Sequence, residues 1–195
     1  ILKGLDIAYK IGDSDERTIM NVASAYEAVN DSISSILFCD KAYEMIQKNG
    51  INAENADIVA RLMSCYALHG FNEKAHSCYA LLSQIPKCDR PGNYNINLAK
   101  YYEQCVSVDS AASIMLNILD ENNRLESVYN ASRWLTKYYI AQKKYDSAAT
   151  YAINFINANE KVIKKRKFEQ TANANNILKY SRDVEEEKKM IENSK

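Results

Sequence analysis

The sequence predicts an all-α protein built from repeated pairs of helices. Of its 195 residues only 5 are glycine and 2 are proline, too few for the many tight turns of a β fold. Apolar side chains recur at spacings of three and four residues, which is typical of amphipathic helices. A tyrosine that returns at a nearly regular interval indicates that the helices are copies of one unit.

The elements are expected in the following order. Residues 1–11 are predicted to form the second helix of a preceding pair, and Asp13 and Glu16 fit a capping box that starts the next helix. Four helix pairs then follow near residues 14–50, 54–88, 92–122 and 126–160. Residues 1–167 would form the repeat domain. Residues 168–195 would form a long, charged C-terminal helix, which we expect to continue in a longer parent chain because no glycine or proline ends it.

The repeat is read from two aligned positions in each pair. One is a tyrosine, and the four copies follow one another at intervals of 40, 36 and 37 residues: Tyr26, Tyr66, Tyr102 and Tyr139. The other is a small residue nine positions later: Ser35, Ala75, Ala111 and Ala148. Small side chains are needed where two helices cross closely, because larger ones push the backbones apart. We therefore predict that both positions belong to the core of each pair.

This apolar–tyrosine–small pattern resembles the tetratricopeptide repeat (TPR) family over about residues 14–160. The resemblance implies an α-α superhelix, a right-handed solenoid whose first helices line a concave groove for a peptide or a partner helix. The chain departs from the family pattern in three ways. The first-helix tryptophan is missing in register, the glycine after the apolar residue is replaced, and the closing proline is approximated only by Pro86.

By this resemblance, positions on the first helices that avoid the core pattern face the groove. In the first three pairs they include Arg17, Met20, Ser24, Asp57, Ser64 and Asn93. The predicted partner-binding residues lie on the last two pairs: Asn97, Lys100, Asn130, Arg133 and Lys137. Their amide and cationic groups suit a peptide backbone or a carboxylate. The lysine–asparagine–arginine clamp of chaperone-binding TPR domains has no match here, and an ordinary polar solenoid face is the alternative interpretation.

Neither catalysis nor a metal is predicted. The chain has no glycine-rich phosphate loop and no G-x-S-x-G motif. Cys65 and His69 stand four residues apart, with His76 and Cys78 on the next helix, but this is no standard zinc pattern. No cofactor is therefore expected. Five cysteines at irregular spacings do not form a disulfide framework and mildly favour a reducing compartment.

The charge and the hydropathy exclude two further classes. The chain carries 25 basic and 25 acidic residues, so it lacks the electrostatic footprint of a nucleic-acid-binding protein. No run of apolar residues approaches the roughly 20 that are needed to cross a bilayer. The predicted function is a non-enzymatic protein–protein interaction scaffold that binds a protein or peptide.

The segment from residue 145 onward resembles the end of extracytoplasmic TPR sensor regions in bacterial membrane-anchored regulators. In those proteins the last repeat runs into a charged helix and then a transmembrane span. The resemblance implies a sensing or dimerisation domain on the periplasmic side, active as a homodimer and reaching the membrane only through a segment outside this sequence. A cytosolic adaptor or a self-associating structural module is the alternative.

Overall fold

The computed structural model describes residues 15–121 and 124–193, and all regular structure in these residues is helical. The α-helices are α2 (Glu16–Ala28), α3 (Ser32–Asn49), α4 (Ala56–Leu68), α5 (Asn72–Ser83), α6 (Tyr94–Cys105), α7 (Val108–Glu121), α8 (Leu125–Ala141) and α9 (Tyr145–Asn193). A short 3-10 helix, η1 (Lys87–Asp89), precedes α6. The predicted all-α class is confirmed for this part of the chain, and none of its helices is long and apolar enough to span a bilayer.

The predicted start of the first complete pair needs one correction. The helix expected over residues 1–11 and Asp13 lie outside the described residues. The N-cap of α2 is Asp15, whose carboxylate accepts a hydrogen bond from the backbone N–H of Thr18 at 2.7 Å. This bond satisfies one of the free N–H groups of the first turn and holds the pKa of Asp15 below its ordinary value.

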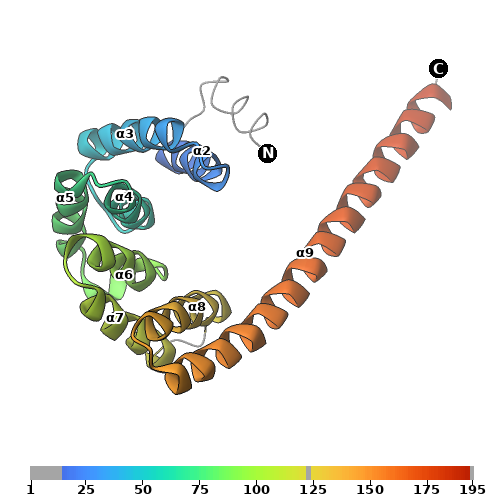
Figure 1. The fold of residues 1–195 in the computed structure, drawn as a ribbon. Coiled ribbons are helices and arrows are strands. Elements are labelled where there is room, and N and C mark those ends of the chain that lie inside the picture. Colours follow the sequence, from blue (N-terminus) through green and yellow to red (C-terminus); the bar gives the residue numbers. More distant parts are fainter. Residues whose placement is uncertain (1–14, 122–123, 194–195) are drawn as a thin grey trace. The chain divides into compact units, whose positions relative to one another are not determined.

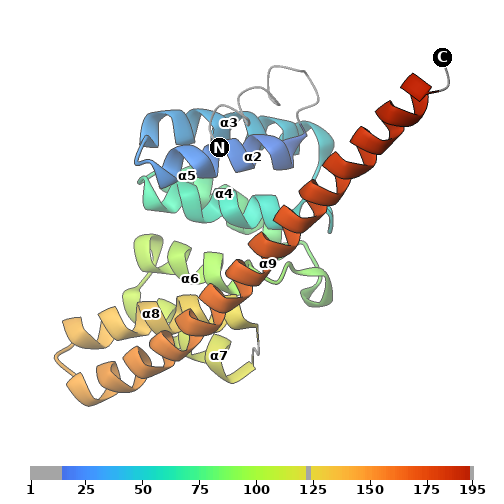
Figure 2. The ribbon, with the colours of Figure 1, turned by 90° about the vertical axis from the view of Figure 1, so that its right-hand side faces the viewer.

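The chain divides between residues 122 and 123 into two compact units. In the first unit, α2 packs on α3, α4 on α5 and α6 on α7. Within this unit α4 also contacts α2 and α6. Figures 1 and 2 show the three pairs stacked in chain order, with α2, α4 and α6 as neighbours along one side.

All four predicted turns share one backbone hydrogen bond. The fifth residue after the aligned tyrosine donates its N–H to the carbonyl of that tyrosine: Asp31 to Tyr26 at 3.0 Å, Phe71 to Tyr66 at 2.9 Å, Ser107 to Tyr102 at 2.8 Å and Lys144 to Tyr139 at 2.9 Å. The carbonyl of this fifth residue then accepts a bond of 3.0 Å from the aligned small residue: Ser35, Ala75, Ala111 or Ala148. The register read from the sequence thus coincides with a repeated Schellman-type helix end.

Three of these turns need a left-handed backbone at the residue before the shared donor. Asn30, Gly70 and Lys143 have φ of 60°, 78° and 57°. Only glycine adopts this region without a steric cost from its Cβ, and asparagine tolerates it better than lysine does. Lys143 is therefore the strained member of the set.

Replacing Lys143 by glycine is expected to raise the free energy of unfolding of the second unit by about 0.5–1 kcal/mol, because the substitution removes that steric cost. Lys143→Ala is the matched control and should change little, since alanine keeps the Cβ. Conversely, Gly70→Ala should cost about 1 kcal/mol in the first unit, although nothing lies within 4 Å of the added Cβ. Urea denaturation followed by circular dichroism measures all three. Equal stability of the two Lys143 variants would contradict the argument.

The aligned residues lie at the helix–helix contacts. Ala75 and Ala111 are fully buried and Ala148 is nearly so. Tyr66 is fully buried against Tyr43 and Phe71, and its hydroxyl donates to Asp40 at 2.8 Å. The other three aligned tyrosines are half-buried and lie against a second ring. Tyr26 stacks on Phe38, Tyr102 meets Tyr79 edge-on, and Tyr139 stacks on Tyr151.

The second unit consists of α8 packed along the first part of α9. The packed side of α9 carries Ala148, Ala158 and Val162, all buried. Lys165 forms an ion pair of 2.7 Å with Glu126 at the start of α8. The helix predicted to begin at about residue 168 is a continuation of α9, which runs unbroken for 49 residues. Of the side chains after Val162 that the structure describes, nearly all are exposed.

Candidate functional site

The side of the first unit formed by α2, α4 and α6 is held together by polar bridges. At one end, Arg17 on α2 and Asp57 on α4 form a bidentate pair with N–O distances of 2.7 and 2.9 Å. The guanidinium also donates to the carbonyl of Glu54 at 3.0 Å. Two residues predicted to face a groove thus bind each other across successive helix pairs.

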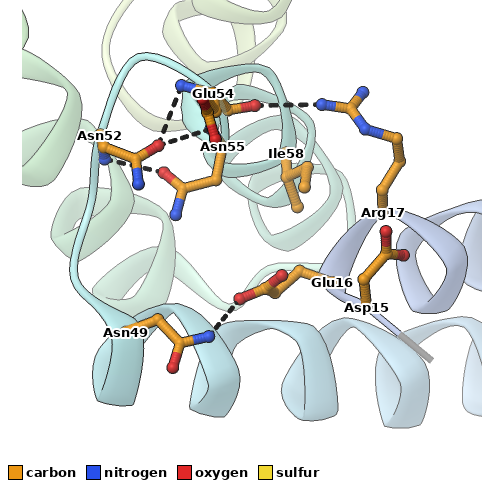
Figure 3. A pocket seen from close by; sticks show the side chains of 8 residues that line it. All are labelled: Asp15, Glu16, Arg17, Asn49, Asn52, Glu54, Asn55 and Ile58. Carbon is orange, nitrogen blue, oxygen red and sulfur yellow. Dashed lines mark hydrogen bonds between the residues drawn. The ribbon is translucent and has the colours of Figure 1, made fainter. Parts of the chain in front are cut away.

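Figure 3 shows the cavity beside this pair, which has a volume of about 270 Å³. Its lining is polar except for one isoleucine: Asp15, Glu16, Arg17, Asn49, Asn52, Glu54, Asn55 and Ile58. The lining groups bond to one another. Asn49 donates to Glu16 at 2.5 Å, and the side-chain oxygen of Asn52 accepts from the backbone N–H groups of Glu54 and Asn55. The cavity therefore lies at the contact between the first two helix pairs, and its polar groups are already bonded to one another.

In the middle of the same face, Arg61 of α4 binds three groups of α2. It donates to the side-chain oxygen of Asn21 at 3.1 Å, to the hydroxyl of Ser24 at 2.7 Å and to the carbonyl of Met20 at 3.0 Å. Burial lowers the pKa of Arg61, and the charge of Asp57 opposes that shift. Arg61 is not among the residues that the repeat pattern places in the groove.

The next bridge involves Asn97, which the sequence placed in the groove. Asn97 is 6% exposed. Its side-chain oxygen accepts from Ser64 of α4 at 2.9 Å, and its amide donates to the carbonyl of Asn93 at 3.0 Å. The side-chain oxygen of Asn97 is thus engaged in the contact between α4 and α6, and its amide bonds to the N-cap residue of its own helix.

Lys100, one turn further along α6, is exposed on this face. Surrounding protein nevertheless lowers the pKa of its ammonium by desolvation, while the negative charges of Cys65, Glu103 and Glu27 oppose that shift. Lys100 therefore lies near a cluster of ionisable side chains contributed by α2 and α4. Its role as a groove residue stays a prediction.

That cluster forms where α2 and α4 end. His69 Nε2 lies 2.8 Å from Glu27 Oε2, and the ligand atoms of Glu27, Cys65 and His69 all lie within 4.8 Å of one another. Cys39 of α3 donates its S–H to Cys65 at 3.2 Å. This bond, with smaller contributions from Ser35 and the charge of His69, lowers the pKa of the Cys65 thiol against the effect of burial.

The structure separates the four residues that the sequence analysis weighed as metal ligands. Cys65 and His69 share the cluster, but His76 forms a 2.8 Å hydrogen bond with the hydroxyl of Tyr101. Cys78 is fully buried, and burial raises the pKa of its thiol to about 12. The two cluster members that sequence reasoning missed, Glu27 and Cys39, are 42 and 26 residues away from the residues they contact. Only the stacking of α2, α3 and α4 brings them there.

In the second unit, three predicted groove residues occupy exposed positions on α8. Asn130, Arg133 and Lys137 all lie on its solvent side, and the Asn130 amide donates to the carbonyl of Glu126 at 2.8 Å. Their role as a binding surface stays a prediction. Trp134 stacks on Tyr138 at a ring distance of 5.4 Å, so it packs along its own helix.

Comparison with known proteins gives no relative: no family model, no curated protein and no solved structure matches this chain. The tetratricopeptide resemblance therefore rests on the sequence pattern alone. Two features bear on the function: the polar face of the first unit and the exposed part of α9 in the second unit.

Proposed function

We propose that this chain is a non-enzymatic protein-interaction scaffold, a solenoid of stacked helical hairpins that presents α9 as a binding helix. The observation that carries the proposal is the exposure of large apolar side chains on the distal part of α9. Ile163 is 44% exposed, Ile177 69% and Tyr180 73%. Apolar side chains gathered on one surface segment are typical of sites that bind another protein.

The lengths of the two helices in the second unit support this proposal. At a rise of 1.5 Å per residue, α9 is about 74 Å long, whereas the 17 residues of α8 extend over only about 26 Å. The buried side chains of α9 end at Val162. A single polar helix without tertiary packing is only marginally stable in water, so a partner that covers the distal part would stabilise it.

The spacing of apolar residues in α9 favours a second copy of the chain as that partner. Isoleucine or valine recurs at intervals of seven residues, with a single glutamine in the series: Ile156, Ile163, Gln170, Ile177, Val184 and Ile191. Such a ladder supplies one of the two lines of a coiled-coil seam, while the second line, three residues further on, is mostly polar and contains Tyr180. One polar residue within the apolar line fixes the register. Each copy supplies the same ladder, which makes the helix complementary to itself.

A homodimer built in this way agrees with the resemblance to bacterial membrane-anchored regulators. In that reading α9 joins two sensing domains on the extracytoplasmic side, and the polar faces of the repeats, including Arg133 and Lys137, receive a peptide or protein. A cytosolic adaptor or a self-associating structural module is the alternative. The homodimer requires self-association through α9, so it is the property to test first.

Sedimentation equilibrium tests the proposal on the full chain. We expect a monomer–dimer equilibrium. Ile177→Glu should raise the dissociation constant at least about 30-fold, because it places a charge in the seam. Gln170→Ile should tighten the dimer by removing the polar residue from the seam. Far-ultraviolet circular dichroism should show helix content falling with dissociation.

Asn175→Glu is the matched control, since residue 175 lies five positions after Gln170 on the outer side of the predicted coiled coil. It adds the same charge and should leave the dimer intact. A chain that stays monomeric at all concentrations would overturn the proposal, and so would equal weakening by Ile177→Glu and Asn175→Glu.

A further inference from the structure

We propose that Glu27, Cys65 and His69 form a binding site for one Zn²⁺-type divalent cation at the junction of α2 and α4. The site is separate from the interaction surface on α9 and does not depend on it. The carboxylate comes from the last turn of α2, the thiol from the last turn of α4 and the imidazole from the C-cap of α4. The three ligand atoms already lie within 4.8 Å of one another.

The geometry needs little change to accept the ion. Zinc bonds of about 2.0–2.3 Å in a tetrahedral arrangement place neighbouring ligand atoms roughly 3.3–3.7 Å apart. Glu27 and His69 are now 2.8 Å apart and joined by a hydrogen bond. A metal ion would take the place of that bond and separate the two groups by about half an ångström, while the Cys65 sulfur, within 4.8 Å of both, would move toward them by a side-chain rotation.

The donor set selects the kind of metal. A thiolate sulfur is a soft ligand, and an imidazole nitrogen suits zinc, cobalt or copper better than magnesium or calcium. One thiolate and one carboxylate give two negative charges, which match a divalent ion. The site thus favours Zn²⁺ and its spectroscopic substitute Co²⁺, with water as the fourth ligand.

Two neighbouring residues adjust the site without being ligands. Cys39 is fully buried, and its S–H donates to the sulfur of Cys65 at 3.2 Å, which fixes the orientation of that sulfur. Lys100 of α6 is the second neighbour: desolvation lowers the pKa of its ammonium, and the nearby carboxylate of Glu27 opposes that shift.

Access to the site is open on the side of Glu27. The Glu27 side chain is 37% exposed and that of His69 is 16% exposed, and Cys65 is also partly exposed. An ion can therefore reach all three ligands from solvent. Bound there, it would tie the ends of two successive first helices together.

Cobalt titration of the full chain tests the inference, after chelator treatment and in the presence of a non-thiol reductant that keeps Cys39 and Cys65 reduced. We expect one equivalent of Co²⁺ to give the visible absorption of a tetrahedral site and a thiolate-to-cobalt charge-transfer band, both displaced by Zn²⁺. Zn²⁺ should also raise the melting temperature of the first unit, because it binds the folded state only.

Cys65→Ser, His69→Gln and Glu27→Gln should each weaken binding at least about tenfold, and Cys65→Ser should abolish the charge-transfer band. The matched controls are Cys88→Ser and His76→Gln, a thiol and an imidazole outside the cluster, which should bind like the parent chain. Substoichiometric binding would overturn the inference, as would a charge-transfer band that survives Cys65→Ser or is lost in Cys88→Ser.

Discussion

Replacing Tyr66 by alanine is expected to lower the free energy of unfolding of the first unit by about 4 kcal/mol. Tyr66 is fully buried, and its ring contacts Tyr43 and Phe71 at centroid distances of 5.9 and 6.3 Å. The substitution removes these contacts and leaves a cavity inside the second helix pair. Since small domains are stable by only about 5–15 kcal/mol, this loss brings the first unit close to unfolding.

Two further variants separate the contributions of Tyr66. Tyr66→Phe keeps the ring and removes only the 2.8 Å hydrogen bond to Asp40, so we expect a loss of about 1 kcal/mol. The loss stays small because Asp40 keeps its ion pair with Lys74 at 2.6 Å. Tyr145→Ala is the exposed control, since that side chain is 66% exposed, and should cost less than about 0.5 kcal/mol.

Guanidinium denaturation followed by tyrosine fluorescence and circular dichroism measures these differences. The three variants should rank as Tyr66→Ala, Tyr66→Phe and Tyr145→Ala in order of decreasing loss. A Tyr66→Ala chain that unfolds within about 1 kcal/mol of the parent would contradict the core role of the aligned tyrosine.

The aligned residues of the repeat could be identified from the sequence because they are set by contacts within a single hairpin. A small residue nine positions after a tyrosine indicates that the two helices of one hairpin cross closely there. The whole hairpin lies within a single stretch of about 35 residues. The same is true of the turns, because the residue types at Asn30 and Gly70 favour a left-handed backbone. The left-handed residue Lys143 could not be predicted in this way, because lysine rarely adopts that conformation.

Contacts between successive hairpins could not be read in the same way. Whether Asn97 faces solvent or Ser64 depends on how α6 is rotated against α4, and several rotations agree with one apolar stripe. The 49-residue length of α9 could not be predicted either, because no residue near position 168 indicates whether the helix ends or continues there. The partners of Cys65, separated from it by 26 to 38 residues, depend on the stacking itself.

Replacing Arg61 is expected to cause the second large loss of stability. We expect Arg61→Met to lower the free energy of unfolding by about 2–3 kcal/mol, because the guanidinium donates to three acceptors on α2, and bonds to a charged group are the stronger ones. Methionine keeps the apolar stem of the side chain and so isolates the loss of the polar bridge. Arg17→Met is the matched control. It also removes a bridge between α2 and α4, but the Arg17 side chain is 51% exposed, so the loss should stay below about 1 kcal/mol.

Which helices become less stable in the Arg61→Met variant is as informative as how much free energy of unfolding the variant loses. In a stack of repeats each hairpin is stabilised by its neighbours, so weakening one junction releases the outer hairpin before the inner ones. Hydrogen exchange should therefore show that Arg61→Met lowers the protection of α2 and α3 while α6 and α7 keep theirs. Uniform loss of protection across α2–α7 would instead mean that the first unit unfolds as one cooperative block, and that Arg61 supports the whole of it rather than one junction between hairpins.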